Sequence, residues 1–258
     1  MTSMPVFFVS HGAPTFAVEP GLIGPLLRQT AARLPVPAAI LVVSPHWITP
    51  DPMVTASARP ETLHDFGGFP EPLYRLQYPA PGQPELAQQL VALLRAQGYR
   101  AATDATRGLD HGAWVPLRYL YPEADIPVLQ LSMPAWLGAP QAWTLGEALQ
   151  PLRERGVLIL ASGSLTHNLY EFRENAVIDA DYALAFERWA RAAVMRHDRE
   201  ALIDYLNAAP HGRRAHPTPD HYLPLLVAAG AATAEARVTV LEGDMRYGML
   251  SMESYLFE

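Results

Sequence analysis

Short apolar runs without polar alternation recur along the chain and constrain its fold more than any other feature of the sequence. Such runs occupy residues 4–9, 39–43, 127–131 and 157–161. A strand that is apolar on both faces must be buried on both faces, and continuous runs are therefore typical of a parallel sheet. Between the runs, apolar residues recur at helical spacing. We therefore expect an α/β sandwich in which helices cover a mainly parallel central sheet.

Helices and further strands follow from the same patterns. The expected helices cover residues 21–33, 84–97, 141–155 and 181–196, and the additional strands cover 53–58, 237–241 and 249–257. Another helix should begin near His221, because Thr218 suits an N-cap and Pro219 suits the first helical position. No linker or repeat divides the 258 residues, so a single domain over residues 1–258 is expected.

Residue types and motifs that are absent exclude several classes of enzyme. The chain has no cysteine, which removes disulfides, thiolate ligands and cysteine nucleophiles. All 19 basic residues are arginine, which excludes a Schiff-base enzyme and a P-loop NTPase. The sequence contains no Gly-x-Ser-x-Gly, His-Glu-x-x-His or Gly-x-Gly-x-x-Gly motif. Serine α/β-hydrolases, zincins and dinucleotide-binding proteins are therefore not supported.

The net charge and the apolar stretches of the sequence indicate which partners and which cellular location to expect. The formal net charge of −7 argues against a nucleic-acid partner. The first residues lack the positive stretch and cleavage site of a secretion signal, and the longest apolar stretches fall short of the roughly 20 residues that span a bilayer. We expect a cytoplasmic protein with a small-molecule partner and neither a membrane nor a nucleic-acid partner. The sequence does not indicate its oligomeric state.

Histidines follow three of the expected core strands, each after a serine that ends the strand. His11 comes directly after its serine, His46 two positions after, and His167 five positions after. Because the carboxyl ends of parallel strands share one edge, these imidazoles are expected to converge there. One histidine after a strand is usually an ordinary loop residue, but three favour a metal or catalytic site, and His221 is a fourth candidate. Imidazole suits zinc and iron in catalytic centres.

Two more histidines lie in glycine-containing loops. His111 precedes the apolar segment 113–121, and the neighbouring Asp110 is a candidate to set its tautomer. His64 and Phe69 belong to the loop His-Asp-Phe-Gly-Gly-Phe-Pro. Such a loop either lines a pocket for a flat substrate or forms a surface turn, and we take both residues as substrate-binding candidates.

Six short motifs carry these residues. They are Ser-His-Gly-Ala-Pro from residue 10, Ser-Pro-His-Trp from 44, His-Asp-Phe-Gly-Gly-Phe-Pro from 64, Asp-His-Gly from 110, Ala-Ser-Gly-Ser through His-Asn-Leu over 161–169, and Pro-Thr-Pro-Asp-His-Tyr-Leu-Pro-Leu from 217. They occur in the order seen in class III extradiol ring-cleavage dioxygenases. The chain resembles that family over nearly its whole length, and most closely its 4,5-DOPA dioxygenase branch.

The resemblance implies a metal-dependent dioxygenase that opens the ring of a catecholic substrate, DOPA or a related phenolic, with O2 to give a semialdehyde. It implies one divalent metal per chain, with Fe(II) expected for activity and Zn(II) as an alternative occupant. By position, His11, His46, His167 and His221 match histidines of the metal site. His111 and His167 match acid–base histidines, so His167 has two candidate roles.

One position departs from the wider family, whose iron site has two histidines and one carboxylate. Here His221 occupies the corresponding position late in the chain. The carboxylates that could approach are Asp220, which is adjacent, and Glu242, but neither lies in a recognised ligand motif. An all-histidine set also suits zinc, which does not activate dioxygen. Two alternatives therefore stay open: a zinc-dependent hydrolase and a non-enzymatic metal-binding protein on the same fold. Three arginines are equal candidates for holding a substrate carboxylate: Arg59, Arg75 and Arg118.

Overall fold

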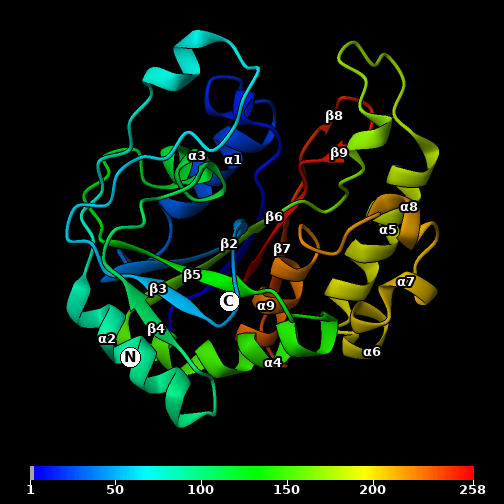
Figure 1. Cartoon of the computed structure of the whole chain (residues 1–258). Coiled ribbons are helices and arrows are strands. Elements are labelled where there is room, and N and C mark those ends of the chain that lie inside the picture. The colour runs from blue at the N-terminus through cyan, green and yellow to red at the C-terminus, as the bar shows by residue number, and fades with distance from the viewer. Residues whose placement is uncertain (1–2) are drawn as a thin grey trace.

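The computed structural model describes residues 3–258 and is built around one large sheet (Figure 1). Its strands are β1 (Val6–Ser10), β2 (Ala39–Thr49), β3 (Met53–Thr55), β4 (Ala102–Asp104), β5 (Val128–Pro134), β6 (Val157–Gly163), β7 (Val238–Leu241) and β10 (Ser254–Phe257). They lie in the order β4-β3-β5-β2-β6-β1-β10-β7. Two short strands, β8 (Met245–Arg246) and β9 (Leu250–Ser251), form a separate antiparallel pair.

The centre of the sheet is parallel. β2 pairs in parallel with both β5 and β6, and β6 pairs in parallel with β1. Antiparallel pairs occur toward the edges, where β10 joins β1 to β7 and β3 joins β5. The carboxyl ends of β1, β2, β5 and β6 therefore meet at one edge, and the mainly parallel sheet expected from the sequence is confirmed.

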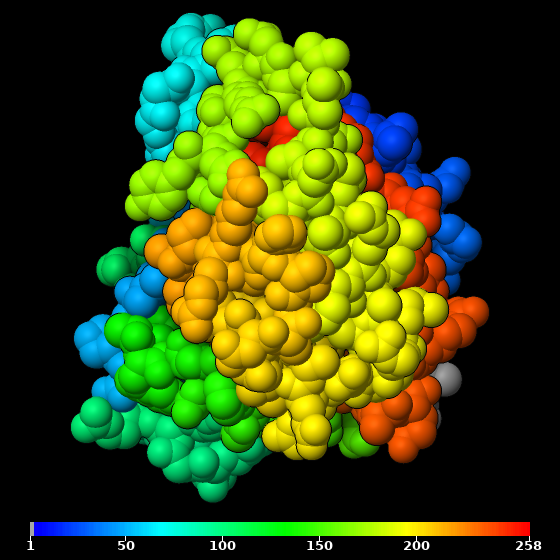
Figure 2. Space-filling view, turned by 90° about the vertical axis from the view of Figure 1, so that its right-hand side faces the viewer, coloured from blue at the N-terminus to red at the C-terminus, as the bar shows by residue number. Residues whose placement is uncertain are grey.

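Helices cover both faces of the sheet. The α-helices are α1 (Ile23–Ala31), α2 (Pro84–Ala96), α3 (His111–Leu120), α4 (Ala139–Leu149), α5 (Asp181–Met195), α6 (Arg199–Ile203), α7 (Tyr205–Ala208), α8 (Gly212–Ala215) and α9 (Leu223–Ala231). The 3-10 helices are η1 (Pro14–Ala17), η2 (Glu71–Arg75), η3 (Gln150–Arg155) and η4 (Leu169–Glu171). In Figure 1, α1 and α3 lie on one face and α2, α4 and α9 on the other. Helices α5 to α8 form a continuous flank, coloured yellow to orange in Figure 2. No helix within residues 3–258 is long and apolar enough to cross a membrane.

Two hydrophobic cores lie on opposite faces of the sheet, and the side chains of β1 alternate between them. Val6 and Phe8 pack into the core beneath α4 and α9, whereas Phe7 and Val9 pack into the core beneath α1 and α3. All four side chains are fully buried. Burial of each stabilises the fold by about 1.5–3 kcal/mol. This double burial explains why the strand sequences are apolar throughout.

Several elements differ from the sequence-based expectation. All of segment 113–121 except the C-cap Tyr121 belongs to helix α3, which begins at His111, so that His111 is helical and not in a loop. The expected helix over 141–155 ends as an α-helix at Leu149 and continues as the 3-10 turn η3. Pro151 lies at the start of that turn and has no N–H to continue the α-helical ladder.

The helix expected to begin near His221 starts at Leu223 instead, with Tyr222 as its N-cap. Residues 217–222 form turns, in which the carbonyl of Pro219 accepts hydrogen bonds from the N–H groups of Tyr222 and Leu223 at 2.9 and 3.1 Å. Thr218 therefore lies too early in the chain to cap this helix. His221 is held on a hydrogen-bonded turn directly before α9.

Candidate metal centre

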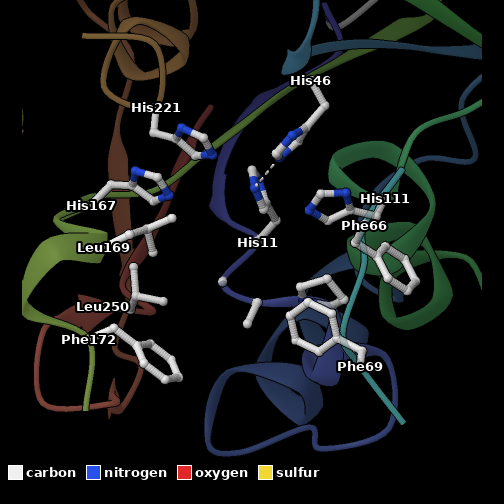
Figure 3. Close-up of a pocket in the computed structure, with 13 residues that line it drawn as sticks. His11, His46, Phe66, Phe69, His111, His167, Leu169, Phe172, His221 and Leu250 are labelled. Carbon is white, nitrogen blue, oxygen red and sulfur yellow. Dashed lines mark hydrogen bonds between the residues drawn. The ribbon is translucent and has the colours of Figure 1, made fainter. Parts of the chain in front are cut away.

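Five histidines from five separate segments line one cavity at the carboxyl edge of the sheet (Figure 3). His11 directly follows β1, His46 lies near the end of β2, and His111 lies in the first turn of α3. His167 lies in the loop after β6, and His221 lies in the turn before α9. The cavity has a volume of about 410 Å³. The convergence expected for His11, His46, His167 and His221 is thus present in the structure, and His111 joins them.

His11 and His46 face each other with their Nε2 atoms 3.0 Å apart. Candidate donor atoms of His11, His46 and His221 all lie within 4.8 Å of one another. Two nitrogens bound to the same ion at about 2.1 Å and at a right angle are separated by about 3.0 Å. The spacing between His11 and His46 therefore fits two ligands of one metal ion.

A local irregularity in β2 helps to direct His46 toward this point. The register between β2 and β5 shifts between Val43 and Ile48, and His46 lies inside the shifted stretch. Bulges of this kind commonly re-aim a side chain beside an active site. Pro45 has no backbone N–H, so it cannot donate a hydrogen bond to a neighbouring strand. Its position in the shifted stretch, where the regular pairing is interrupted, therefore costs the sheet no hydrogen bond.

The tautomer of His11 is fixed by Ser162 at the end of β6. His11 Nδ1 lies 2.9 Å from Ser162 Oγ, and the hydroxyl of Ser162 donates to the carbonyl of Gly112. Because that hydroxyl proton is already committed, Ser162 Oγ accepts the Nδ1–H of His11. The lone pair of His11 is then on Nε2, the atom that faces His46, as a metal ligand requires.

Pro116 makes the carbonyl of Gly112 available for this contact. Pro116 lies inside α3, four residues after Gly112. In an uninterrupted helix the N–H of residue 116 would bond to the carbonyl of residue 112, but proline has no N–H. The free carbonyl of Gly112 instead accepts from Ser162, which orients His11. The proline in α3 therefore determines the ring orientation of His11, which lies directly after β1.

His111 is held by Asp65, not by the adjacent Asp110 that the sequence suggested. Asp65 Oδ1 accepts from the backbone N–H of His111 at 2.9 Å, and Asp65 Oδ2 lies 3.0 Å from His111 Nδ1. Asp110 points into the protein, is fully buried and caps α3 by accepting from the N–H of Ala113. With Nδ1 committed to Asp65, Nε2 of His111 is left for the cavity.

His221 and His167 form a stacked pair on the opposite side of the cavity. Their ring centroids lie 3.6 Å apart with an interplanar angle of 5°. Nδ1 of His221 contacts the carboxylate of Asp220, which again leaves Nε2 as the exposed lone pair. His167 shares a potential ligand group with Asp220 and His221, but not with His11 and His46.

Two glycines allow the histidine-bearing segments to approach one another. A Cβ on Gly112 would lie 2.3 Å from Ser44 Oγ and 3.0 Å from the His46 ring. A Cβ on Gly163 would lie 2.4 Å from the backbone oxygen of His221. The same oxygen accepts a hydrogen bond from the N–H of Ser164 at 2.9 Å, which ties the His221 turn to the end of β6. A side chain at Gly112 would therefore displace Ser44 beside His46, and one at Gly163 would displace the backbone of His221.

Burial lowers the pKa of three imidazoles of the cavity, those of His11, His46 and His167. Burial, followed by the neighbouring His46 and His221, lowers the pKa of His11 well below its usual value of 6.5. Burial, together with His111 and His221, lowers the pKa of His46 to about 2, although Asp65 opposes this shift. Burial and His221 lower the pKa of His167 to about 3. Neutral imidazoles with available lone pairs are the form that binds a metal ion.

Two apolar walls lead from the histidines to the mouth of the cavity. Phe66 and Phe69 form one wall, and Leu169, Phe172 and Leu250 form the other (Figure 3). Phe69 thus lies where a substrate-binding residue is expected. His64 does not line the cavity, because its Nε2 is bonded to the carbonyl of Leu76 at 3.0 Å and its ring packs against Phe66 and Trp114.

The additional charged candidates lie elsewhere. Glu242 forms a salt bridge with Arg191 at 2.9 Å and is not part of the candidate ligand groups found in residues 3–258. Arg75 is exposed and paired with Glu71. Arg59, Arg75 and Arg118 are not among the residues that line the cavity.

Several contributing residues were not singled out from the sequence: Asp65, Ser162, Pro116, Phe66 and Phe172. Ser162 carried a usable signal, since it ends a core strand in the same way as the serines before His11 and His46. Asp65 and Phe66 lie in a motif that was recognised, but nothing in a loop sequence indicates which of its side chains point inward. The role of Pro116 becomes visible only once the helix around it is known.

Comparisons with known proteins agree with this geometry. Residues 12–257 match the family described as the catalytic LigB subunit of aromatic ring-opening dioxygenase. The 4,5-DOPA dioxygenase extradiol of Beta vulgaris is 41% identical over 255 residues, which cover 97% of this chain and 95% of the relative. The protein of the same name from Escherichia coli K12 is 39% identical over 259 residues, with 98% and 94% covered. A solved structure of an uncharacterized protein from Escherichia coli K12 superposes with a TM-score of 0.84 at 33% identity, and covers 99% of this chain and 100% of that one.

The fold and the site together define an α/β enzyme with a cluster of imidazoles at the carboxyl edge of a parallel sheet that could hold a metal ion. The chain belongs to the LigB family of aromatic ring-opening dioxygenases. The resemblance found in the sequence motifs is thereby confirmed, and the protein is a metal-dependent ring-opening dioxygenase.

Proposed function

We propose that the protein opens the ring of a catechol at the extradiol position, with O2 as the second substrate. The observation that carries this proposal is the end of the cavity, where the imidazoles of His11, His46 and His221 converge beneath apolar walls. In this proposal the flat ring of the catechol lies between the walls, with its two hydroxyl groups directed at the histidines. The relatives named 4,5-DOPA dioxygenase extradiol make DOPA the first catechol to test.

His11, His46 and His221 would hold the metal ion. Their donor atoms form one group, and hydrogen bonds to Nδ1 of His11 and His221 leave Nε2 of each as a lone pair toward the others. Bound Fe(II) would supply a Lewis acid for the catechol oxygens and a redox centre for dioxygen. Zn(II) suits the same nitrogen donors without redox activity, so we propose Fe(II) as the active ion.

His111 and His167 are the proposed acid–base residues. Asp65 fixes Nδ1 of His111, so Nε2 is the atom that takes the phenolic proton from the catechol and returns it later. His167 lies across the cavity, stacked on His221 and outside the ligand group of His11 and His46. This position favours the acid–base role of His167 over the ligand role. The cytoplasmic location stays a prediction.

Oxygen consumption tests the proposal directly. Apo-protein is loaded without oxygen with either Fe(II) or Zn(II) and is then mixed with aerated DOPA and simple catechols. We expect oxygen uptake and a coloured ring-opened product with Fe(II) only, and none from a His11→Ala variant. Silence from protein with verified iron content would refute the proposal. Ester or amide hydrolysis that needs Zn(II) but not oxygen would favour the hydrolase alternative.

A further inference from the structure

We propose that His216, which is buried outside the cavity, is a positioning residue that holds His167 and His221 in their stacked arrangement. The inference rests on the proposed function and deepens it, because His167 is a proposed acid–base residue and His221 a proposed metal ligand. His216 is a buried histidine that the proposed chemistry does not use. Its contacts reach both of the segments that carry the stacked pair.

The first contact joins His216 to the segment that carries His167. Nε2 of His216 lies 2.9 Å from the carbonyl oxygen of Leu165, two residues before His167. Burial lowers the pKa of His216 to about 4, although the hydrogen bond to Leu165 opposes this shift. The ring is therefore neutral at pH 7, and its Nε2–H donates to the carbonyl. Ala215, at the end of α8, adds a second link, because its carbonyl accepts from the N–H of His167 at 2.9 Å.

The second contact joins His216 to the turn that carries His221. The His216 ring packs against Tyr222, the residue directly after His221, with 5.2 Å between ring centroids. Tyr222 is fully buried and stacks on Tyr205 at 4.0 Å between centroids. His216 thus lies between this fixed ring and the backbone of the His167 segment.

The other nitrogen of His216 shows that the bond to Leu165 is the polar contact that the ring supplies. Nδ1 is buried and has no hydrogen-bond partner within residues 3–258. Phe186 and Tyr205 face the ring at 5.2 and 6.0 Å between centroids. A buried acceptor without a partner is unfavourable, and an apolar side chain would fill the same space without that penalty. The hydrogen bond to Leu165 is what an apolar side chain could not provide.

The stack of His167 and His221 needs support of this kind. The two ring centroids lie 3.6 Å apart with an interplanar angle of 5°. Aromatic rings prefer offset or edge-to-face arrangements over a close face-to-face one. The surrounding backbone therefore holds the two imidazoles in place, and His216 contacts both of the segments involved. Loss of its bond to Leu165 would let His167 turn away from His221 and from the cavity.

NMR spectroscopy of the Zn(II)-loaded protein tests the positioning without any turnover. The ring protons of His167 are shielded by the His221 ring, and their signals are identified by their loss in His167→Gln. In His216→Asn the amide is one carbon too short to reach Leu165. In the matched control His216→Gln, the amide nitrogen is as many bonds from Cα as Nε2 is. We expect the His167 signals to move downfield in His216→Asn and to keep their wild-type positions in His216→Gln.

Turnover by the Fe(II)-loaded protein provides the second arm. His216→Asn should lower kcat about tenfold or more and shift its pH profile, with little change in the KM for catechol, whereas His216→Gln should restore kcat. Val91→Ala controls for a general loss of stability. It creates a cavity in the core beneath α2, on the other side of the molecule from α8 in Figure 1, and should alter neither the His167 signals nor kcat.

His216→Phe repeats the test if His216→Asn does not fold by circular dichroism, since it fills the space of the ring without a donor. Unchanged His167 signals in the folded variant would overturn the inference, and so would displaced signals with wild-type kcat. Equal impairment of His216→Gln and His216→Asn would also overturn it. Failure of the proposed function has a different signature: the His167 signals move in His216→Asn as expected, but wild-type Fe(II) protein forms no ring-opened product from any catechol.

Discussion

Asp65 holds His111 at two points, the backbone N–H and ring Nδ1, with hydrogen bonds of 2.9 and 3.0 Å. Although burial opposes ionisation of Asp65, the hydrogen bonds from His111 lower its pKa to about 2, so it is an anion at neutral pH. A carboxylate in this position fixes both the tautomer and the direction of the imidazole. In other enzymes too, an acid–base histidine is oriented by a carboxylate that accepts a hydrogen bond from its Nδ1–H.

Asp65→Asn should separate orientation from metal binding. The amide keeps the shape of the side chain but removes its charge and can present an N–H to Nδ1. We expect kcat to fall by about 10–100-fold with a shifted pH profile, and the metal content to stay at the wild-type level. Glu71→Gln, at an exposed ion pair, is the control. Wild-type kcat and pH profile in Asp65→Asn would remove Asp65 from the mechanism.

Pro116→Ala should change stability and metal affinity in opposite directions. Removing a proline from the interior of α3 restores a helical N–H, and we expect the apo-protein to gain about 1–3 kcal/mol in free energy of unfolding. That N–H competes for the carbonyl of Gly112, which releases the Ser162 hydroxyl and disturbs the tautomer of His11. Metal affinity, measured by competition with a chromophoric chelator, should fall about tenfold.

The control for this prediction is Pro140→Ala. Pro140 lies in the first turn of α4, where a backbone N–H has no helical partner, so the change should leave metal affinity unaltered. Unchanged affinity in Pro116→Ala would show that the carbonyl of Gly112 does not control His11.

Gly163→Ala should displace the turn that carries His221. The new Cβ would lie 2.4 Å from the backbone oxygen of His221, so the turn must move. We expect a loss of about 1–3 kcal/mol in stability and a fall in metal affinity of about tenfold or more. Gly67→Ala is the matched control, since its Cβ would meet no atom within 4 Å. Full metal occupancy in Gly163→Ala at limiting metal would argue against His221 as a ligand.

Replacing His46 should abolish metal binding, whereas replacing His64 should not. His46 faces His11 at 3.0 Å, but His64 is bonded to the carbonyl of Leu76 outside the cavity. After gel filtration, His46→Ala should retain less than about a tenth of the wild-type metal, and His64→Ala should retain all of it. Circular dichroism checks that both variants fold. A metal-loaded His46→Ala variant would contradict the assigned ligand set.

The apo-protein should lose stability as the pH falls below 6.5. Burial lowers the pKa of His216 to about 4 despite the opposing hydrogen bond to the carbonyl of Leu165, and the pKa values of His167 and His46 lie lower still. Between the folded-state values and 6.5 the unfolded chain binds protons that the folded chain does not. Stability therefore rises with pH in this window, by up to about 1.4 kcal/mol per pH unit for each histidine.

Denaturant unfolding at pH 7.5, 6.5 and 5.5 in the presence of a chelator measures this slope. His216→Gln should reduce it by the contribution of one histidine, because His216 is buried away from the cavity. Asp65 does not account for the slope, since its lowered pKa affects stability only below its usual value of 3.8. Stability that is constant or increasing from pH 6.5 to 5.5 would contradict the assignment of neutral buried histidines.

The sequence predicted those parts of the site that depend on strand geometry. His11 and His46 each follow an apolar strand, and parallel strands bring their carboxyl ends together wherever the exact element boundaries fall. The partner of His111 could not be predicted in this way. Sequence adjacency suggested Asp110, but a residue directly before a helix turns inward as a cap, and Asp65 reaches His111 only because its loop returns across the site.

The start of α3 was missed for a related reason. Pro116 interrupts what would otherwise be a recognisable helical segment, and the helix persists because tertiary contacts bury nearly all of it. The short edge strand β4 was also missed, since its residues are only partly buried or exposed and carry no strong β pattern. Both elements depend on packing partners that a local pattern does not contain.

The five imidazoles belong to segments spread between positions 11 and 221, so every contact among them joins distant parts of the chain. Such contacts form late, after the loops between them have closed. An unfolded chain therefore offers no preformed site, and metal binds the native state selectively. Free metal in excess of its dissociation constant then lowers the population of unfolded molecules that proteases attack. The metal content of a preparation thus reports how much of the protein has folded, whichever ion fills the site.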